Sequence, residues 1–294
     1  MIAVAAAARV RLLNLVSSQA ELDLILRVTA LLVLLHARTS AGLNALLRIE
    51  CLVVLAFPGL LTNPRMWILL TATLLIGNVP QWSTIDNHQY LIGYWVLACA
   101  LALRSAAPMA YLRVSARALV AAVFGFAVLW KVLAGEYLDG TFFYWTFFMD
   151  ARLSRIAALL AGQSVTDITT AAGALRMFGE WGADGTTVGV RQVPGVWTAA
   201  IVAAWLGLTL EAGVAVSHLL PRVSMYRIRH LLLSVFVGCT YFFLPVVGFA
   251  FVLTVLGMAE CGGHDLRRRA RYVVLLLLIQ LTTVPWQALL VATE

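Results

Sequence analysis

Long, continuous apolar runs such as Val273–Leu281, separated by short arginine-bearing segments, dominate this chain. Apolar residues make up 62% of it and charged residues only 12%, against about 25% in soluble domains. That is too little charge to cover a water-facing surface, so we predict an integral membrane protein. Backbone polar groups in hydrocarbon must pair within the chain, which leaves helices or a closed barrel. Barrel strands alternate in polarity, so continuous runs favour helices.

We therefore expect an all-α fold: a polytopic integral membrane helical bundle forming a single domain over residues 1–294. A crossing helix needs about 20 residues. The segment 228–258 contains Pro245, which would kink or break a helix. It is one bent crossing or two short ones, giving eight or nine transmembrane helices. The apolar segments lie at 22–37, 43–61, 66–80, 88–104, 114–135, 196–220, 228–258 and 271–292.

The arginines favour nine crossings, because cytoplasmic loops are enriched in Lys and Arg. With a cytoplasmic N-terminus and nine crossings, thirteen arginines face the cytoplasm and five the opposite side, where the C-terminus then lies. The cytoplasmic thirteen are Arg9, Arg11, Arg65, Arg104, Arg113, Arg117, Arg222, Arg227, Arg229, Arg267, Arg268, Arg269 and Arg271. The other five are Arg38, Arg152, Arg155, Arg176 and Arg191. We expect a multi-pass protein of the cell membrane.

The long connection at about 136–195 reads as an extracytoplasmic, interfacial insertion. Its first part, Glu136–Asp150, is rich in Phe, Tyr and Trp, which is unusual for a solvated loop. In 151–161, Leu153, Ile156 and Leu160 share one helical face, a pattern typical of a helix lying in the membrane interface. A second short helix is predicted over 168–178, capped by Asp167.

The net charge of +7 comes from twenty arginines and one lysine. The arginines are dispersed between apolar runs, as membrane topology requires, and we expect no nucleic-acid partner. Four cysteines show neither CxxC nor Cys/His spacing, so we predict no disulfide framework and no metal site. The partners we expect are membrane lipid and a lipid-soluble small molecule.

Lys131, the only lysine, lies within a predicted span. Charges at a helix centre cost about 2.5–3.5 kcal/mol by insertion scales. Lysine can lose its proton when desolvated and arginine cannot, so Lys131 is a candidate base. The alternatives are a lysine reaching the interface or a structural pair with Glu50. We expect Glu211 to lie deeper, toward the cytoplasmic leaflet, and to pair with Arg27.

In the nine-crossing topology His88 lies at the same bilayer level as Lys131, together with Arg48 and Glu50. A shared outer-leaflet pocket would follow. The alternative is that Asp86 and Asn87 cap a helix and that His88 lies among headgroups. At the opposite end we expect headgroup contacts from His218, His230 and Arg229.

Three stretches, in order over about residues 20–260, resemble one family. They are Asp86-Asn87-His88-Gln89-Tyr90-Leu91, Trp130–Gly140, and Leu210-Glu211-Ala212-Gly213 followed by 229–256. They are similar to the horizontally transferred transmembrane (HTTM) family, which includes the membrane domain of vitamin K-dependent γ-carboxylase. The resemblance implies an HTTM-like transmembrane domain with a quinol site, where Lys131 is the base and His88 lies beside it.

The departures from that pattern are specific. The carboxylase has adjacent lysines, of which the second is catalytic, and a gapless match places Val132 there and Lys131 opposite the first. A one-residue shift in the following turn would restore the match. Gly238-Cys239 stands where the family has a histidine, and nothing corresponds to the carboxylase's large lumenal domain. We therefore do not expect a true γ-glutamyl carboxylase.

Two hypotheses follow. The first is a quinol- or lipid-dependent membrane enzyme with Lys131 and His88 as catalytic residues and a menaquinol or other isoprenoid quinol as cofactor or substrate. Its expected substrate-binding residues are Arg48, Glu50, Asn87, Tyr90, Trp130, Tyr137 and Asp139. The second is a non-catalytic membrane subunit that binds lipid or a partner protein. Transport is disfavoured, because the chain lacks the inverted repeat that many carriers show.

Overall fold

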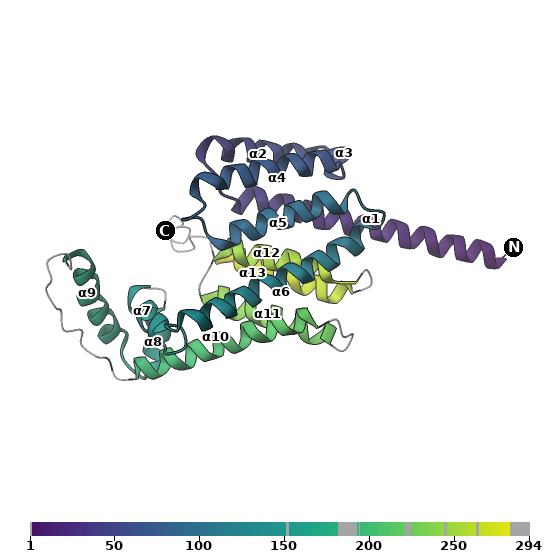
Figure 1. Ribbon diagram of the computed structural model, residues 1–294. Helices are drawn as coiled ribbons and strands as arrows, with labels where there is room; N and C mark the ends of the chain where they lie inside the picture. Colours follow the sequence, from purple (N-terminus) through teal and green to yellow (C-terminus); the bar gives the residue numbers. More distant parts are fainter. Residues whose placement is uncertain are drawn as a thin grey trace, which may run out of the picture. The chain divides into compact units, whose positions relative to one another are not determined.

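The computed structural model describes residues 2–150, 153–181, 193, 195–220, 225–243, 246–262 and 265–282, with side chains described in these ranges except at residues 2–18 and 174–181. Within these ranges the chain forms thirteen α-helices, one 3-10 turn and no strand, which confirms the all-α prediction. Figure 1 shows the helices in chain order.

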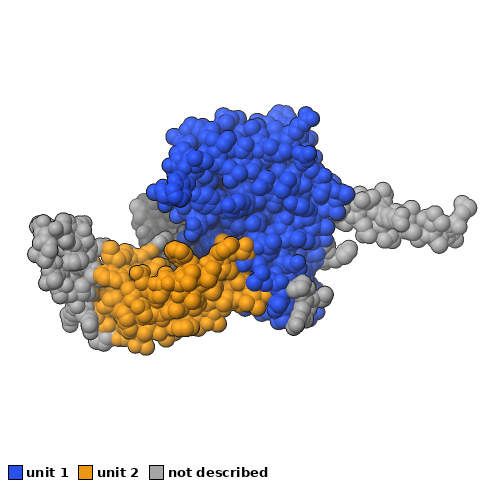
Figure 2. Space-filling view, viewed as in Figure 1, with its two compact units in different colours: residues 1–121, 217–294 blue, residues 122–216 orange. Residues whose placement is uncertain are grey.

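The chain divides into two compact units (Figure 2). Unit 1 comprises residues 1–121 and 217–294, and unit 2 comprises residues 122–216. Unit 2 therefore contains the predicted insertion together with parts of the two helices that flank it. The prediction of one domain over the whole chain stays a prediction.

Unit 1 is built from nearly parallel and antiparallel helices around one central helix. Every residue of α12 from Ala250 to Glu260 is buried, and α12 packs against α1, α5, α11 and α13. A helix that is apolar on all sides must lie inside a bundle. The helices of unit 1 are α1 (Ile2–His36), α2 (Ala41–Ala56), α3 (Pro58–Leu61), α4 (Pro64–Asn78), α5 (Asn87–Ala102), α11 (Met225–Phe243), α12 (Val247–Glu260) and α13 (Leu266–Leu281). The 3-10 turn Val79–Gln81 follows α4.

The predicted segment 228–258 is two helices. α11 ends at Phe243 and α12 begins at Val247, so the break falls around Pro245, which itself lies outside the described residues. Arg229 near the start of α11 contacts Glu260 at the end of α12. The two helices are therefore antiparallel, as two successive crossings would require.

Unit 2 is centred on an antiparallel helix pair. α6 (Pro108–Ala134) and α10 (Val196–Leu219) begin or end in unit 1 and run through unit 2. Three shorter helices lie between them in sequence: α7 (Thr141–Met149), α8 (Ser154–Ala161) and α9 (Val165–Trp181). Gly140 sits at the start of α7 with a φ of 86° and packs against Ile201, so close that an added Cβ would lie 2.8 Å from a side-chain carbon.

Two described helices, α6 and α10, are long and apolar enough to cross a bilayer. By this measure the prediction of eight or nine such helices is not confirmed. α2, α4, α5 and α13 have 15 or 16 residues and α12 has 14, below the roughly 20 needed for a perpendicular span. The number of crossings stays a prediction.

The insertion is helical, as predicted, but its details differ. In α8 the buried residues are Ser154, Ala157 and Ala158, while Leu160 is 54% exposed, and the placement of this helix in the membrane interface stays a prediction. α9 begins at Val165, three residues before the predicted start. Ser164 caps it, its hydroxyl accepting from the Asp167 backbone N–H at 3.1 Å.

Candidate functional site

Lys131 and Glu211 form an ion pair in unit 2. The Lys131 Nζ donates to both carboxylate oxygens of Glu211. The side chains are 23% and 12% exposed, so the pair is largely withdrawn from the surface. The two groups face each other because α6 and α10 run antiparallel here. Further along the chain from Lys131, Gly140 lies against Ile201, which precedes Glu211 on α10.

Tyr137 completes this cluster. The Lys131 Nζ lies 4.7 Å from the centre of the Tyr137 ring, within the range of a cation–π contact. Tyr137 is only 7% exposed and packs against Phe142 and Phe143, with ring centres 5.5 and 5.4 Å apart. Burial, and next the Glu211 carboxylate, raise the pKa of Tyr137, so its hydroxyl stays protonated at neutral pH. We call Lys131, Glu211 and Tyr137 the lysine site.

The predicted partners of these charges were wrong. Glu211 pairs with Lys131 and not with Arg27, and Lys131 pairs with Glu211 and not with Glu50. The error came from judging depth by counting along each span. α10 begins at Val196, and its residue Ile201 lies level with Gly140. Glu211, ten residues after Ile201, therefore lies level with Lys131, although it is in the second half of α10.

The other predicted site residues of unit 2 do not join the lysine site. Trp130 is 73% exposed. Asp139 is exposed and accepts the Thr141 backbone N–H at 2.9 Å, at the start of α7. That backbone hydrogen bond lowers the pKa of Asp139. The substrate-binding roles of Trp130 and Asp139 stay predictions.

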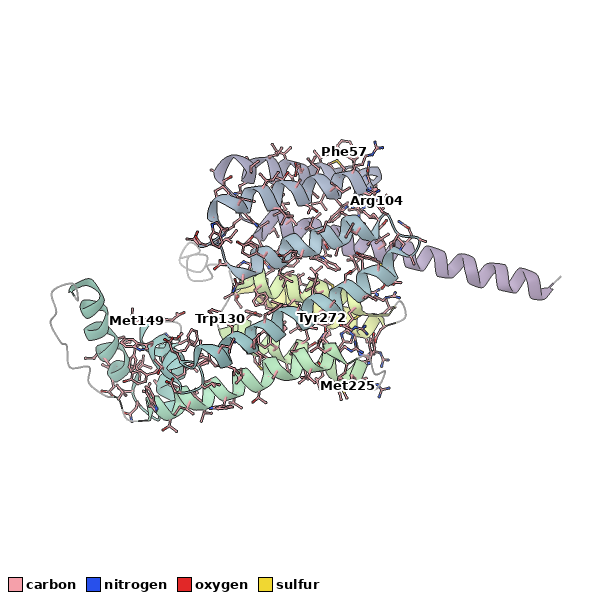
Figure 3. All side chains as sticks on the ribbon, in the orientation of Figure 1. Phe57, Arg104, Trp130, Met149, Met225 and Tyr272 are labelled. Carbon is pink, nitrogen blue, oxygen red and sulfur yellow. The ribbon has the colours of Figure 1, made fainter. Side chains whose placement is uncertain are left out.

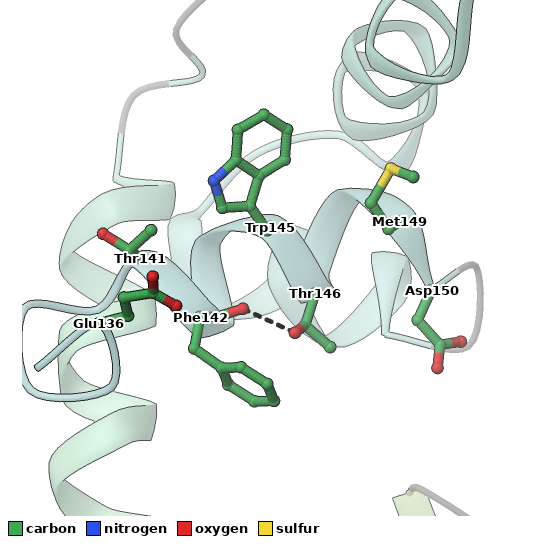
Figure 4. Close-up of a pocket in the computed structure, with 7 residues that line it drawn as sticks. All are labelled: Glu136, Thr141, Phe142, Trp145, Thr146, Met149 and Asp150. Atoms are coloured by element: carbon green, nitrogen blue, oxygen red, sulfur yellow. Dashed lines mark hydrogen bonds between the residues drawn. The ribbon is translucent and has the colours of Figure 1, made fainter. Parts of the chain in front are cut away.

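A shallow groove runs along one face of α7 (Figure 4). Its volume is about 570 Å³. The apolar side chains Phe142, Trp145 and Met149 are each about half exposed, with Glu136 and Asp150 toward the two ends of the groove. The groove is lined by Glu136, Thr141, Phe142, Trp145, Thr146, Met149 and Asp150. This aromatic face of unit 2 could accept an apolar molecule.

His88, the second predicted catalytic residue, belongs to unit 1. Its Nε2 lies 2.9 Å from the Gln89 Nε2, and its ring stacks on Phe249 with centres 6.3 Å apart. The Gln89 amide also donates to the His36 carbonyl and accepts the Arg38 backbone N–H, both at 2.9 Å. His88 thus sits in a polar junction of α1, α5 and α12.

That junction depends on a small residue in α12. A Cβ added to Gly248 would lie 3.0 Å from the His88 Nε2. On the other side, the Gln280 amide lies 3.2 Å from the His36 Nε2. His88 and Lys131 belong to different units, and their sharing of one hollow stays a prediction.

The remaining predicted residues lie on α2 and at the start of α5. Arg48 and Asn87 are exposed, whereas Glu50 is buried and accepts the Thr73 hydroxyl at 3.0 Å. The Tyr90 hydroxyl donates to the Trp82 carbonyl at 2.6 Å. Asp86 stands at the N-cap position of α5, but its side chain makes no capping hydrogen bond. The proposed capping by Asp86 is therefore not what positions His88.

A buried charge network, which the sequence reasoning missed, lies at one end of unit 1. Glu21 on α1 accepts from Arg269 at 2.6 Å and from Arg113 at 3.1 Å. Glu260 accepts from Arg229 at 2.7 Å and lies 3.3 Å from the His218 ring. The network joins the described ends of α1, α6, α10, α11, α12 and α13, which places these arginines at one end of the unit.

Three residues of this network were expected among lipid headgroups, and that prediction was wrong. Arg229 is 4% exposed, and His218 and His230 are each 1% exposed. The His230 Nδ1 lies 2.9 Å from the hydroxyl of the fully buried Tyr272, which Figure 3 labels. The missed signal was Glu260. It ends the apolar helix α12, and in an antiparallel pair this end lies beside the start of α11, where Arg229 is.

Among the described residues, no group of three or more His, Cys, Asp or Glu side chains could hold a metal ion. No protein-family model, curated protein or solved structure matches the chain.

Proposed function

We propose that the chain is a multi-pass membrane protein, HTTM-like in fold, with its N-terminus in the cytoplasm. The low charge content and the apolar helices α6 and α10 support membrane insertion. The packing of Arg113, Arg229 and Arg269 at one end of unit 1 supports the predicted order of crossings, because nine crossings bring these arginines to the same side.

Within this protein, we propose that the lysine site is the acid–base centre of a membrane-embedded enzyme. Its substrate would be a lipid-soluble hydroxyl compound, such as a menaquinol or another isoprenoid quinol. The observation that carries the proposal is the contact of the Lys131 amine with both the Glu211 carboxylate and the Tyr137 ring. Such a group can exchange protons and stabilise charge without help from bulk water.

The chemistry is a two-step proton relay. Lys131 passes a proton to Glu211 and takes the proton of the substrate hydroxyl. The products are a substrate oxyanion, an ammonium group at Lys131 and a neutral Glu211 carboxyl. The ammonium stabilises the oxyanion, and the electron-rich face of Tyr137 stabilises the ammonium. In a site with few water molecules these interactions are stronger than in solution. His88 belongs to unit 1, and its role in orienting or stabilising the substrate stays a prediction.

The second candidate is a non-catalytic subunit that binds lipid or a partner protein. The same ion pair favours it, because both oxygens of Glu211 are already engaged by Lys131 and the pair joins α6 to α10. In this case the lysine site stabilises unit 2 and performs no reaction.

Variants of Lys131 and Glu211, purified in nanodiscs, separate the two candidates. The readouts are turnover of chemically reduced menaquinone and the thermal unfolding midpoint. The enzyme hypothesis expects Lys131→Met and Lys131→Arg to lose turnover. It expects the double variant Lys131→Met with Glu211→Met to be more stable than Lys131→Met alone, but without turnover. Arg155→Met, an exposed change in the same unit, is the control.

Full quinol turnover in both Lys131→Met and Lys131→Arg would exclude the acid–base role. A wild-type protein without quinol turnover, whose single charge variants lose stability and whose neutral pair restores it, would support the structural role instead.

A further inference from the structure

Gln89, in the first turn of α5, is 1% exposed, and its side-chain amide faces two backbone groups at the end of α1. The Gln89 Oε1 accepts the Arg38 backbone N–H and the Gln89 Nε2 donates to the His36 carbonyl, both at 2.9 Å. A backbone N–H can only donate and a carbonyl can only accept. The amide therefore has one possible orientation, because the flipped amide would place donor against donor and acceptor against acceptor.

This orientation determines which nitrogen of the His88 ring carries a proton. The Gln89 Nε2 has two hydrogens, and one of them is given to the His36 carbonyl. The other is available to the His88 Nε2, which lies 2.9 Å away. An amide nitrogen does not accept hydrogen bonds, so the His88 Nε2 must be the acceptor and carries no proton. The neutral His88 ring then has its proton on Nδ1.

The packing of the ring turns Nδ1 away from α12. The Nε2 and Cδ2 atoms of His88 lie 3.0 and 3.2 Å from the position that a Cβ of Gly248 would take. The atom opposite the Nε2–Cδ2 bond of an imidazole is Nδ1. One face of the ring stacks on Phe249. No residue in the described ranges hydrogen-bonds to Nδ1, and the side chain is partly exposed, so the Nδ1–H group is open to a ligand.

We propose that Gln89 is a positioning residue, which holds His88 in the Nδ1–H form so that His88 donates a hydrogen bond to a ligand oxygen. In this form the unprotonated nitrogen, Nε2, is occupied by the Gln89 amide. His88 therefore binds a carbonyl or oxyanion oxygen and does not act as a base toward a hydroxyl group. The use of this donor in catalysis rests on the proposed function, whereas the position of the proton does not.

The test is solid-state nitrogen NMR of the full-length protein in lipid bilayers, with isotopically labelled histidine. The His88 signals are those missing from His88→Phe. At neutral pH we expect Nδ1 to be protonated and Nε2 to be unprotonated. Gln89→Glu replaces the amide hydrogens by a carboxylate oxygen, so Nε2 should become protonated. Gln81→Glu, the same change at an exposed residue of unit 1, is the matched control and should keep the wild-type signals.

A second substitution removes the hydrogen-bond donor without adding charge. Gln89→Met should give a mixture of the two neutral forms of His88, and it carries the test if Gln89→Glu does not fold. A wild-type His88 ring with a proton on Nε2 would overturn the proposal. An Nδ1–H form that persists unchanged in folded Gln89→Glu and Gln89→Met would do the same, because Gln89 would then not determine it.

Two substitutions of His88 test the use of the donor. The amide nitrogen of Asn is two bonds from Cβ, as Nδ1 is, whereas that of Gln is three bonds away, as Nε2 is. Quinol turnover should therefore be about tenfold higher in His88→Asn than in His88→Gln, the effect of one hydrogen bond to a charged oxygen. Equal turnover of the two variants, with an active wild type, would exclude the donor role. A wild type without turnover would contradict the proposed function alone, and the NMR signals would still decide the role of Gln89.

Discussion

The Tyr137 hydroxyl lies against Gly207, so close that a Cβ at position 207 would come within 2.7 Å of the phenolic oxygen. Gly207 thus lets the Tyr137 ring reach the Lys131 ammonium from the α10 side. The glycine of one helix sets the position of the aromatic ring of the lysine site.

Gly207→Ala should therefore displace Tyr137 and lower the stability of the protein, by about 1–3 kcal/mol as for other overpacked cores. Gly125→Ala is the control, because a Cβ there meets nothing within 4 Å. Unfolding of purified protein by increasing SDS in mixed micelles measures the difference. Equal stability of the two variants would mean that Tyr137 has room to move.

The second prediction concerns Glu21, which holds two arginines. Glu21→Gln should leave Arg113 and Arg269 with a neutral partner and cost about 3–5 kcal/mol, the usual loss on breaking a buried ion pair. Arg269→Met should cost more than Arg113→Met, because the side chain of Arg269 is 9% exposed and that of Arg113 is 35% exposed. The same unfolding assay measures all three, and the reverse order would contradict this account.

The third prediction tests the packing of α12 on α13. A Cβ at Gly257 would lie 2.4 Å from the Tyr272 ring, whereas one at Gly238 would lie 3.8 Å from Leu275. Gly257→Ala should be strongly destabilising and should shift the near-ultraviolet circular dichroism of the aromatic residues. Gly238→Ala should leave both signals close to wild type. A Gly257→Ala variant with wild-type stability and unchanged spectra would show that α13 can move away from α12 without loss of stability.

The fourth prediction is a pH dependence at the start of α7. The folded pKa of Asp139 is lowered, first by the Thr141 backbone N–H, so its contribution to stability is present above the unfolded pKa of about 3.9 and is lost as pH falls through the folded value. The order of α7, followed by hydrogen exchange of its amides, should decrease over that range. Asp139→Asn keeps an acceptor and should lose the pH dependence, and an unchanged profile would exclude the role.

Much of the fold follows from local pattern. The helix ends near Leu219 and Ala134, and the break around Pro245, could be predicted because apolar runs and a proline act over a few residues. Lys131 could be singled out because it is the only lysine, and Tyr137 because aromatic residues are rare in solvated loops.

The pairings could not be predicted in the same way. Which acid meets Lys131 depends on the offset between α6 and α10, and a small shift in that offset changes the partner. The burial of His218 depends on Glu260, and that of His230 on Tyr272, which both belong to other helices. The hydrogen bond from Thr73 to Glu50 likewise arises only when α2 folds back on α4. These are long-range facts of packing, and residue spacing within one helix does not contain them.

The ion pair of Glu21 with Arg269 joins residues separated by 248 positions in sequence. During synthesis from the N-terminus, Glu21 emerges early and must wait for Arg269 until α13 is made, so this carboxylate spends most of the process without that partner. Contacts of such long range delay the final closure of a fold. The last described helix thus fixes the first one in place, and a chain truncated before α13 would leave Glu21 on α1 with Arg113 as its remaining described partner.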